Sequence, residues 1–419
     1  MTSENILVNR AISRFLPDVG RRGIVVLTGA RQTGKTTLVK EKYTALRYIS
    51  LDSPENREFL RKVSSESWPK SVGDAVIDEA QKEPVVFEKV KYAYDGNGIR
   101  FTVLTGSSQI LLLKKIRESL AGRAIICELW PLLLSELTGS GKKLVQFPLL
   151  DSLFVDRPIS NLLGNLPEIL LPAEDESLKD AEEYLLQWGG MPALLTLSEA
   201  ERWRWLKDYI YTYLERDLSD LAHLTDLQPF AKFQQLSALR SGQLLNYSEL
   251  ARDTAIGVDT ARRYLEYLRL SYQVLLLQPY YRNLTSSAIK TPKLYLLDIG
   301  ILRSLSGKRG SLDGDIYETM VVAELYKWIK TAQRNVELFF YRTRTGFEVD
   351  LLLKTEYGIF GIEIKARKKL VQSDFRQLKE IAGALGSEWR GGLVIYQGDE
   401  IRKLSEPDIW AVPSRRLFT

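Results

Sequence analysis

The 419-residue sequence has very little of two residues that often bind transition metals, because it contains one cysteine, Cys127, and one histidine, His223. A single thiol excludes a disulfide framework and a multi-cysteine zinc site, so we expect a reducing compartment, the cytoplasm. A single imidazole excludes histidine-rich metal sites. Any bound metal must then rely on carboxylates, which suit Mg²⁺ or Mn²⁺.

Long apolar segments are also missing. No run of about 18 apolar residues occurs, which is the length needed to cross a bilayer, and Met1 to Arg10 contains no apolar signal core. We therefore expect no membrane partner. The composition is ordinary for a globular protein, with 45% hydrophobic residues, 26% charged residues and a net charge of +5. This mildly basic balance permits a nucleic-acid partner without establishing one, and the length indicates roughly two to four domains.

Strand and helix patterns alternate in the first part of the chain. We expect strands at 23–28, 47–51, 75–77 and 101–104 and a helix at 35–43. Strands that alternate with helices predict an α/β fold, in which a parallel sheet carries helices on its faces.

The segment between the first strand and the first helix is a phosphate-binding loop. Gly29 to Thr36 reads GARQTGKT and fits G-x-x-x-x-G-K-[ST] without deviation. Glycines let such a loop turn its N–H groups toward phosphate oxygens, and the following helix adds its positive end. We expect Lys35 to contact the β- and γ-phosphates of ATP and Thr36 to ligate Mg²⁺. The residues expected to bind the nucleotide are Gly29, Ala30, Arg31, Gln32, Thr33, Gly34, Lys35, Thr36, Thr37, Asp78 and Ser107.

Two adjacent acids end the strand at 75–77. We expect Asp78 to hold the Mg²⁺ and Glu79 to activate the attacking water as a general base. An acidic helix cap would give the same pair of residues, but the phosphate-binding loop upstream favours the catalytic interpretation.

Further polar residues follow the strand at 101–104. Ser107 or Ser108 could sense the nucleotide state, because polar groups at the carboxyl ends of parallel strands lie beside the ligand, and a plain turn is the alternative. Arg117 and Arg123 lie in the segment IRESLAGR and are candidates for an arginine finger, with surface arginines as the alternative.

These motifs resemble the AAA-type ATPases of the AAA_14 family, which are often fused to a C-terminal module called DUF4143. The resemblance spans essentially the whole chain and is carried by 29–36 (GARQTGKT), 75–81 (AVIDEAQ), 104–108 (LTGSS), 119–123 (SLAGR) and 188–192 (WGGMP). It implies an AAA-like core, helical elements, a winged-helix-like unit and a nuclease-like terminal domain. AAA-type proteins often form rings in which a neighbour's arginine completes the site, so the resemblance also implies self-association, with a ring as one form.

Helical periodicity continues from about 181 to 235 with many aromatic residues. Packing of this stripe in a helical core is favoured over stacking on nucleic-acid bases. The aromatic residues are Trp188, Trp203, Trp205, Tyr209, Tyr211 and Tyr213.

A helix-turn-helix pattern follows, with a short helix from Tyr247, a glycine-containing turn and a helix at 259–270. We expect Ser248 and Asp259 to cap the two helices and 274–279 to form a wing strand. Contact with DNA and a packing role are both retained as interpretations. The arginines that could meet phosphates or base edges are Arg262, Arg263 and Arg269.

The last part of the chain contains a carboxylate constellation. We expect Glu318 on a helix from near 316, Asp350 on a strand at 349–353, and Glu363 with Lys365 on a strand at 359–365. Residues two apart on a strand point to the same face. Asp350 and Glu363 would hold Mg²⁺ or Mn²⁺, Lys365 would activate water for attack on a phosphodiester, and Glu318 could add a ligand.

This constellation resembles the PD-(D/E)xK nuclease superfamily, an E…D…ExK pattern on an αβββαβ core, although no proline lies beside Asp350. Gln377, on the next helix, is expected at the same end. Metal-dependent cleavage and binding without cleavage both remain as interpretations. The basic cluster at 365–369 would serve phosphate contact or form a solvated turn.

The predicted architecture is an AAA-type P-loop core at 1–175, a helical lid or linker at 176–240, a winged-helix-like unit at 241–290 and a nuclease-like domain at 291–419. We predict an Mg²⁺-dependent, ATP-hydrolysing enzyme that binds and processes DNA, with branched DNA as one substrate. The alternative is a nucleotide-controlled switch whose nuclease-like domain only binds DNA or protein. The residues expected to be catalytic are Lys35, Glu79, Arg123, Glu318, Asp350, Glu363 and Lys365, and those expected to bind metal are Thr36, Asp78, Asp350 and Glu363.

Overall fold

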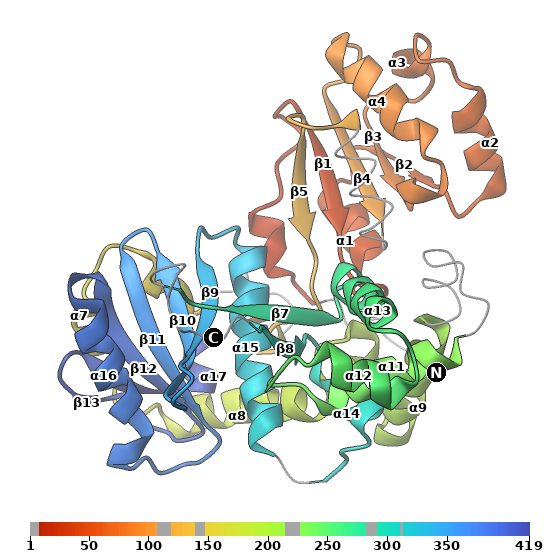
Figure 1. Cartoon of the computed structure of the whole chain (residues 1–419). Helices are drawn as coiled ribbons and strands as arrows, with labels where there is room; N and C mark the ends of the chain where they lie inside the picture. The colour runs from red at the N-terminus through yellow and green to blue at the C-terminus, as the bar shows by residue number, and fades with distance from the viewer. Residues whose placement is uncertain (1–7, 107–118, 139–146, 214–226, 282–290, 311–312) are drawn as a thin grey trace.

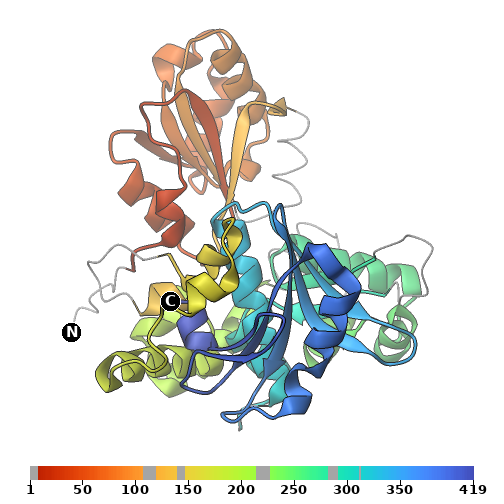
Figure 2. The same cartoon turned by 90° about the vertical axis from the view of Figure 1, so that its left-hand side faces the viewer.

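The computed structural model describes residues 8–106, 119–138, 147–213, 227–281, 291–310 and 313–419. These residues form two sheets, and the predicted α/β fold class is confirmed. Figure 1 shows the smaller sheet in a lobe of its own, and the larger sheet with most of the remaining helices in a second lobe. The view turned by 90° gives the same division (Figure 2).

The smaller sheet has the strand order β2-β3-β4-β1-β5, and all its pairs are parallel. Its strands are β1 Gly23–Thr28, β2 Arg47–Ser50, β3 Ala75–Asp78, β4 Phe101–Gly106 and β5 Ala124–Glu128. Its helices are α1 Lys35–Lys42, α2 Pro54–Lys62, α3 Trp68–Ser71 and α4 Val85–Asp95. Ile24 and Val26 point into one hydrophobic core, and Val25 and Leu27 point into another on the opposite face. A strand buried on both faces needs such a continuous apolar run.

Strand order in this sheet decides which loops meet. Because β4 lies between β1 and β3, the carboxyl ends of these three strands are neighbours at one edge. The loop after β1, the acids after β3 and the polar residues at the end of β4 therefore face the same space.

The helical middle of the chain contains α8 Pro172–Trp188, α9 Glu199–Tyr213, α11 Gln228–Leu239 and α14 Ile299–Ser306. Trp188 packs edge-on against Trp203, with ring centroids 5.1 Å apart, and Tyr209 is also buried. The packing interpretation of the aromatic stripe is confirmed for these residues, whereas Tyr211 is exposed. The shorter helices α6 Leu134–Leu137 and α7 Ile159–Leu163 connect this region to the first lobe and to the larger sheet.

Two helices at the helix-turn-helix pattern, α12 Tyr247–Thr254 and α13 Val258–Leu270, precede β7 Val274–Pro279. The predicted caps are wrong by two residues each. The side chain of Asn246 accepts the N–H of Glu249 at 3.1 Å, and Gly257 precedes α13. An N-cap side chain must lie just outside the helix to reach its third N–H, which Ser248, inside the first turn, cannot do.

The larger sheet has the order β13-β14-β12-β11-β10-β9-β7-β8-β6. The αβββαβ succession predicted for the C-terminal region is present, with two further strands and a helix after it. It consists of α15 Gly314–Thr331, β9 Glu337–Arg342, β10 Glu348–Thr355, β11 Gly358–Lys365, α16 Arg376–Leu385 and β12 Trp389–Tyr396. The remaining elements are β6 Gln243–Leu244, β8 Lys293–Leu296, β13 Arg402–Ser405, β14 Ile409–Pro413 and α17 Ser414–Leu417.

The sheet runs across the boundary expected near residue 290. β7 pairs antiparallel with β8 and parallel with β9, so strands from the helix-turn-helix region and from the C-terminal region share one sheet. The division into four units remains a prediction. Among the residues that the structure describes, no helix combines the length and the apolarity required to cross a membrane.

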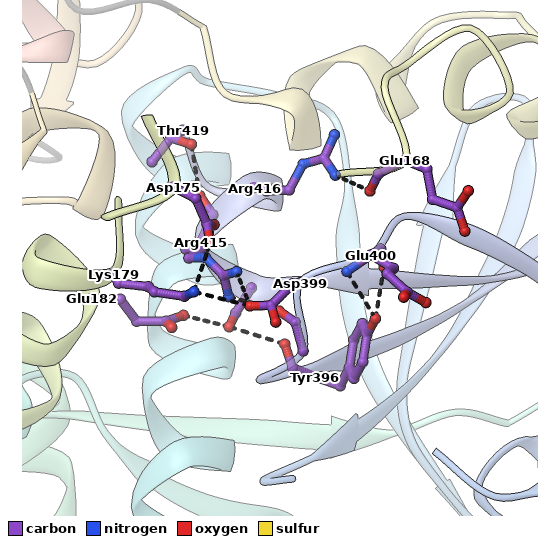
Figure 3. Close-up of polar contacts among 12 residues, drawn as sticks. Glu168, Asp175, Lys179, Glu182, Tyr396, Asp399, Glu400, Arg415, Arg416 and Thr419 are labelled. Carbon is purple, nitrogen blue, oxygen red and sulfur yellow. Dashed lines mark hydrogen bonds and ion pairs between the residues drawn. The ribbon is translucent and has the colours of Figure 1, made fainter. Parts of the chain in front are cut away.

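A buried polar cluster ties the end of the chain back to α8 (Figure 3). The guanidinium group of Arg415, on α17, donates to Asp175 at 2.6 Å and to Asp399 at 2.7 Å. The hydroxyl group of Ser414 donates to the carboxylate of Glu182. Because Arg415 is buried, these partners are needed to offset the loss of its hydration.

Candidate functional sites

The loop between β1 and α1 has the backbone that phosphate binding requires. Gly29 has a φ of 149°, and a Cβ at this position would lie 2.1 Å from the carbonyl oxygen of Leu129, so only glycine fits. Gly34, with a φ of 95°, turns the chain into α1. The loop therefore leads directly onto the amino end of a helix, where N–H groups and the helix dipole attract anions.

Lys35 and Thr36 begin α1 beside this loop. The buried ammonium group of Lys35 donates to the carbonyl oxygens of Gly29 and Ala30, at 3.0 and 2.7 Å, so it is held against the loop. The hydroxyl group of Thr36 donates to Asp78 Oδ2 at 2.8 Å. The two residues predicted to hold Mg²⁺ are thus in direct contact, although they are 42 residues apart.

Asp78 is buried at the end of β3 and accepts two further hydroxyl groups. Tyr48, on β2, donates to Oδ2 at 2.5 Å, and Thr105, at the end of β4, donates to Oδ1. Thr105 lies in the LTGSS motif, although no role was predicted for it, and no sequence pattern pointed to Tyr48. Ser107, Ser108 and Arg117, which the sequence did single out, lie outside the described residues.

This donor set fits Mg²⁺, which favours hydroxyl and carboxylate oxygens and usually retains several waters and substrate phosphates. Within the described ranges no group of three or more His, Cys, Asp or Glu residues is arranged to hold a metal, either here or among the C-terminal carboxylates. At the phosphate-binding loop, Thr36 and Asp78 would be the protein ligands.

Glu79 is held in an unusual backbone conformation. Its φ of 58° is left-handed, which costs a non-glycine residue about 1–3 kcal/mol. Its N–H donates to the hydroxyl group of Thr105 at 3.3 Å, and its carboxylate accepts the amide of Gln81 at 2.5 Å. The side chains of Glu79 and Asp78 therefore point in different directions, which allows the two acids to have different roles.

Arg123 is not beside the phosphate-binding loop of its own chain, so it could act as an arginine finger only at a neighbour's site, and that role stays a prediction. It precedes β5, whose Ala124 pairs with Ile24 and whose Glu128 pairs with Thr28. At about 3.3 Å per residue, Arg123 lies about 16 Å from the carboxyl edge of the sheet. Its guanidinium group pairs instead with Asp95 at 2.6 Å.

A cavity of about 280 Å³ lies behind the phosphate-binding loop. Its lining residues come from the segment before β1, from α1 and from the two segments around Leu132 and Pro192, namely Val8, Arg10, Thr33, Gly34, Thr37, Leu38, Glu41, Leu132, Pro192, Ala193 and Thr196. Arg10 donates to the carbonyl oxygens of Thr33 and Trp130, at 2.7 and 2.6 Å, and pairs with Glu136 at 3.1 Å. Arg10 therefore braces the loop, and no sequence motif indicated it.

The segment Trp188–Pro192 leads into the wall of this cavity, which Pro192 lines, and it makes close backbone contact with Leu132. A Cβ on Gly190 would lie 2.3 Å from the carbonyl oxygen of Leu132. The carbonyl oxygen of Gly190 accepts the N–H of Leu132 at 2.6 Å, and its own N–H donates to Asp298 at 2.8 Å. Gly190 is therefore required to bring α14 and the cavity wall together.

The C-terminal carboxylates form a second site, and the structure brings the predicted residues together. Asp350 and Glu363 lie on the neighbouring antiparallel strands β10 and β11. The ammonium group of Lys365 is 2.6 Å from Glu363 Oε2 and 3.5 Å from Asp350 Oδ2, so it bridges the two acids. Asp350 also accepts the N–H of Ile364 at 2.8 Å.

One oxygen of this site has no partner. Glu363 is 3% exposed, and its Oε1 makes no hydrogen bond in the described structure; Oε1 of Gln377, on α16, is in the same situation. Burial, followed by the charge of Asp350, raises the pKa of Glu363. Burial alone would lower the pKa of Lys365, but the charges of Asp350 and Glu363 outweigh it and raise that pKa. A bound cation would satisfy Oε1 and offset the repulsion between the acids.

Glu318 joins the site from α15. Burial and the charge of Asp350 raise the pKa of Glu318, which places the two carboxyl groups within electrostatic reach of each other. The hydroxyl group of Tyr295 donates to Glu318 Oε1 at 2.6 Å, and the ammonium group of Lys293 lies 3.6 Å from the same oxygen. Tyr295 and Lys293 come from β8, and no sequence pattern indicated their role.

The basic residues proposed to meet DNA are partly engaged within the chain. Arg262 lies 3.8 Å from Asp259, and Arg269 pairs with Glu266 at 2.6 Å. In the cluster at 365–369, Arg367 pairs with Asp374, while Lys368 and Lys369 are exposed. DNA contact by these residues therefore stays a prediction.

Three family models match successive parts of the chain. AAA_14, described as an AAA domain, matches residues 21–138. DUF8612 and DUF4143, both described as domains of unknown function, match residues 178–312 and 313–417. The first match coincides with the smaller sheet, and the last contains Glu318, Asp350, Glu363 and Lys365.

Several known proteins resemble the chain. An uncharacterized protein of Mycobacterium tuberculosis is 27% identical over 420 residues, which cover 98% of this chain and 84% of that protein. One of Methanocaldococcus jannaschii is 24% identical over 368 residues, or 83% and 75% of the two chains.

Among solved structures, a Walker-type ATPase of Pyrococcus abyssi is 17% identical with a TM-score of 0.42 and covers 71% of this chain and 95% of its own. AMPPCP-bound DnaA from Aquifex aeolicus is 14% identical with a TM-score of 0.23 and covers 62% and 86%. Similarities this low do not bear on the function. The assignment comes instead from the family models, the phosphate-binding loop and the parallel sheet. The chain joins a P-loop AAA domain of the AAA_14 type, matched over residues 21–138, to a C-terminal DUF4143 domain, matched over residues 313–417.

Proposed function

We propose that the first lobe hydrolyses ATP with Mg²⁺. The observation that carries this proposal is the contact of the Thr36 hydroxyl group with Asp78, next to the buried Lys35. Lys35 balances the charge of the β- and γ-phosphates, and bound Mg²⁺ would add further positive charge there. Glu79 accepts a proton from the attacking water. The cavity behind the loop, with Leu38, Leu132 and Pro192 in its wall, takes the base and sugar of the nucleotide.

The test compares nucleotide binding with hydrolysis in three variants. Glu79→Gln keeps the size of the side chain but cannot accept the proton, so we expect normal binding of a fluorescent ATP analogue and a fall in turnover of roughly 100-fold or more. Lys35→Ala weakens binding as well. Glu58→Gln, an exposed carboxylate on α2 paired with Lys62, serves as the matched control. Full turnover by Glu79→Gln would contradict the assignment of the base.

A second activity is proposed for the C-terminal site, metal-dependent cleavage of DNA. The observation that favours it is the unpartnered Oε1 of Glu363 beside Asp350 and Lys365. Asp350 and Glu363 would hold Mg²⁺ or Mn²⁺, which lowers the pKa of bound water and neutralises phosphate charge. Lys365 then orients the water and balances the charge that develops on the phosphodiester.

Linear, plasmid and branched DNA incubated with Mg²⁺ or Mn²⁺ test this activity, with Asp350→Asn alongside the unaltered chain. We expect cleavage that Asp350→Asn abolishes while ATP hydrolysis persists. If the chain hydrolyses ATP but cuts no substrate, the terminal domain binds DNA or protein without cleavage, and the nucleotide-controlled switch is the better description.

Self-association is part of the proposal, because Arg123 lies at the amino edge of the sheet and could only complete a neighbour's site. Light scattering of Glu79→Gln with and without Mg²⁺ and ATP measures it. We expect a larger particle with nucleotide, and an unchanged mass would contradict the ring.

The single cysteine supports residence in the cytoplasm.

A further inference from the structure

Two residues that precede the DUF4143 match reach the carboxylate site of the C-terminal region. The hydroxyl group of Tyr295 and the ammonium group of Lys293 both lie against Oε1 of Glu318, at 2.6 and 3.6 Å. Lys293 also pairs with Oε1 of Glu348, at 2.6 Å. Glu348 is on β10, two residues before Asp350, so Lys293 connects the helix that carries one acid of the site to the strand that carries another.

Burial makes these contacts costly to break. Lys293 is 4% exposed and Tyr295 is fully buried. An ammonium group taken out of water must keep its carboxylate partners, since an unpaired buried charge costs several kcal/mol. Glu348 has a second partner, Arg342, at 3.1 Å. Glu318 and Glu348 are therefore held in one position by their hydrogen-bond and ion-pair partners, although their side chains are flexible.

The bend of the larger sheet makes this reach possible. In strand order β8 is separated from β10 by β7 and β9, and a flat sheet would place β8 and β10 about 14 Å apart. Figure 1 shows β7 running at a steep angle to β9 and β10. Through this bend the residues of β8 lie against α15 and the start of β10.

We propose that Lys293 and Tyr295 are positioning residues of the carboxylate site, holding Glu318 and Glu348 in the arrangement in which the site accepts a divalent cation. The inference rests on the proposed function of this site. It implies that the site is completed by residues from the region that precedes the DUF4143 match.

The test measures cation binding and cleavage separately in the full chain. Binding of Mn²⁺ without DNA is followed by electron paramagnetic resonance, and only binding that Asp350→Asn removes is counted. We expect Tyr295→Phe and Lys293→Met to weaken this binding about 10-fold, as loss of supporting hydrogen bonds does at other metal sites. Cleavage should show a lower kcat with an unchanged KM for DNA. Lys293→Arg, which retains the charge, should recover part of the binding.

Tyr317→Phe is the matched control. The hydroxyl group of Tyr317, on α15, is buried like that of Tyr295, but it contacts Ser414 at 2.6 Å rather than Glu318. If Tyr295→Phe and the unaltered chain bind Mn²⁺ equally well, Tyr295 is not a positioning residue, and the proposed cation site is unaffected by that result. If the unaltered chain and Asp350→Asn bind Mn²⁺ identically, the cation site fails and the positioning role fails with it. If Lys293→Met does not fold, Tyr295→Phe, which removes one oxygen atom, decides.

Discussion

The phenol of Tyr48 donates a 2.5 Å hydrogen bond to Oδ2 of Asp78, the same oxygen that accepts the hydroxyl group of Thr36. Burial, followed by this bond, raises the pKa of Tyr48, so the phenol remains a neutral donor. The edge strand β2 thus supports the acid that would hold Mg²⁺. Tyr48 belongs to the nucleotide site even though it is 30 residues from Asp78.

Replacing Tyr48 by phenylalanine removes this hydrogen bond and keeps the aromatic ring. A bond to a charged group contributes about 1.5–3 kcal/mol, so we expect the Mg²⁺ concentration for half-maximal ATP hydrolysis to rise about 10-fold or more. Steady-state hydrolysis in a Mg²⁺ titration measures this. Tyr43→Phe, which loses a 2.9 Å bond to the carbonyl oxygen of Pro17, is the control. An unchanged Mg²⁺ dependence in Tyr48→Phe would show that the bond does not support the site.

Gly190→Ala should damage both folding and nucleotide binding. The added methyl group meets the backbone of Leu132 at 2.3 Å, and Leu132 and Pro192 line the cavity behind the loop. We expect a loss of about 1–3 kcal/mol in the free energy of unfolding and weaker binding of an ATP analogue. Gly20→Ala, which has nothing within 4 Å, should change neither quantity. Binding unaffected by Gly190→Ala would separate this wall from the nucleotide.

The buried ion pair of Glu324 and Lys327 on α15 should depend on both partners. Both side chains are almost fully buried, and Glu324 also accepts the N–H of Leu134 at 2.8 Å. Glu324→Gln removes the carboxylate partner of the buried Lys327 and leaves the carbonyl oxygen of Leu132, at 3.5 Å, as its hydrogen-bond acceptor, so we expect a destabilisation of about 3 kcal/mol. Adding Lys327→Met should restore part of the lost free energy of unfolding. Urea unfolding of the single and double variants measures the coupling, and strictly additive losses would contradict the pairing.

Glu182 should make stability depend on pH. Burial is the main cause that raises its pKa from 4.5 to about 7. Between these values the folded chain holds a proton that the unfolded chain has lost, so stability falls as the pH rises through this window.

A glutamine cannot ionise, so Glu182→Gln should gain up to about 3 kcal/mol relative to the unaltered chain between pH 5 and pH 8. Urea unfolding at both pH values gives the difference. Glu176→Gln, an exposed residue on the same helix, should show no such gain. An equal response of the two variants would place the titration elsewhere.

The phosphate-binding loop and the two acids after β3 were predictable because each motif consists of consecutive residues with characteristic side chains. A loop that needs glycine at Gly29 and Gly34 leaves a contiguous pattern, and so does a buried strand that ends in Asp78 and Glu79. The contact between Thr36 and Asp78 follows from the parallel sheet alone. The αβββαβ succession likewise follows from local periodicity, and it placed Asp350 beside Glu363 correctly.

The residues that support these sites could not be predicted in this way. Arg10 meets Glu136 across 126 residues of sequence, and Tyr295 meets Glu318 through a bent sheet. Single hydrogen bonds between remote segments leave no periodic pattern. The position of Arg123 could not be predicted for another reason: β5 was not predicted, and once that strand is known to be parallel to β1, a residue before it must lie at the amino edge.

One consequence concerns β7, which packs under α13 at one end and joins β9 at the other. Since β9 pairs with β10, the helix-turn-helix and Asp350 are mounted on one continuous frame. The separation between α13 and Asp350 is therefore set by strand pairing within one sheet rather than by a linker between two units.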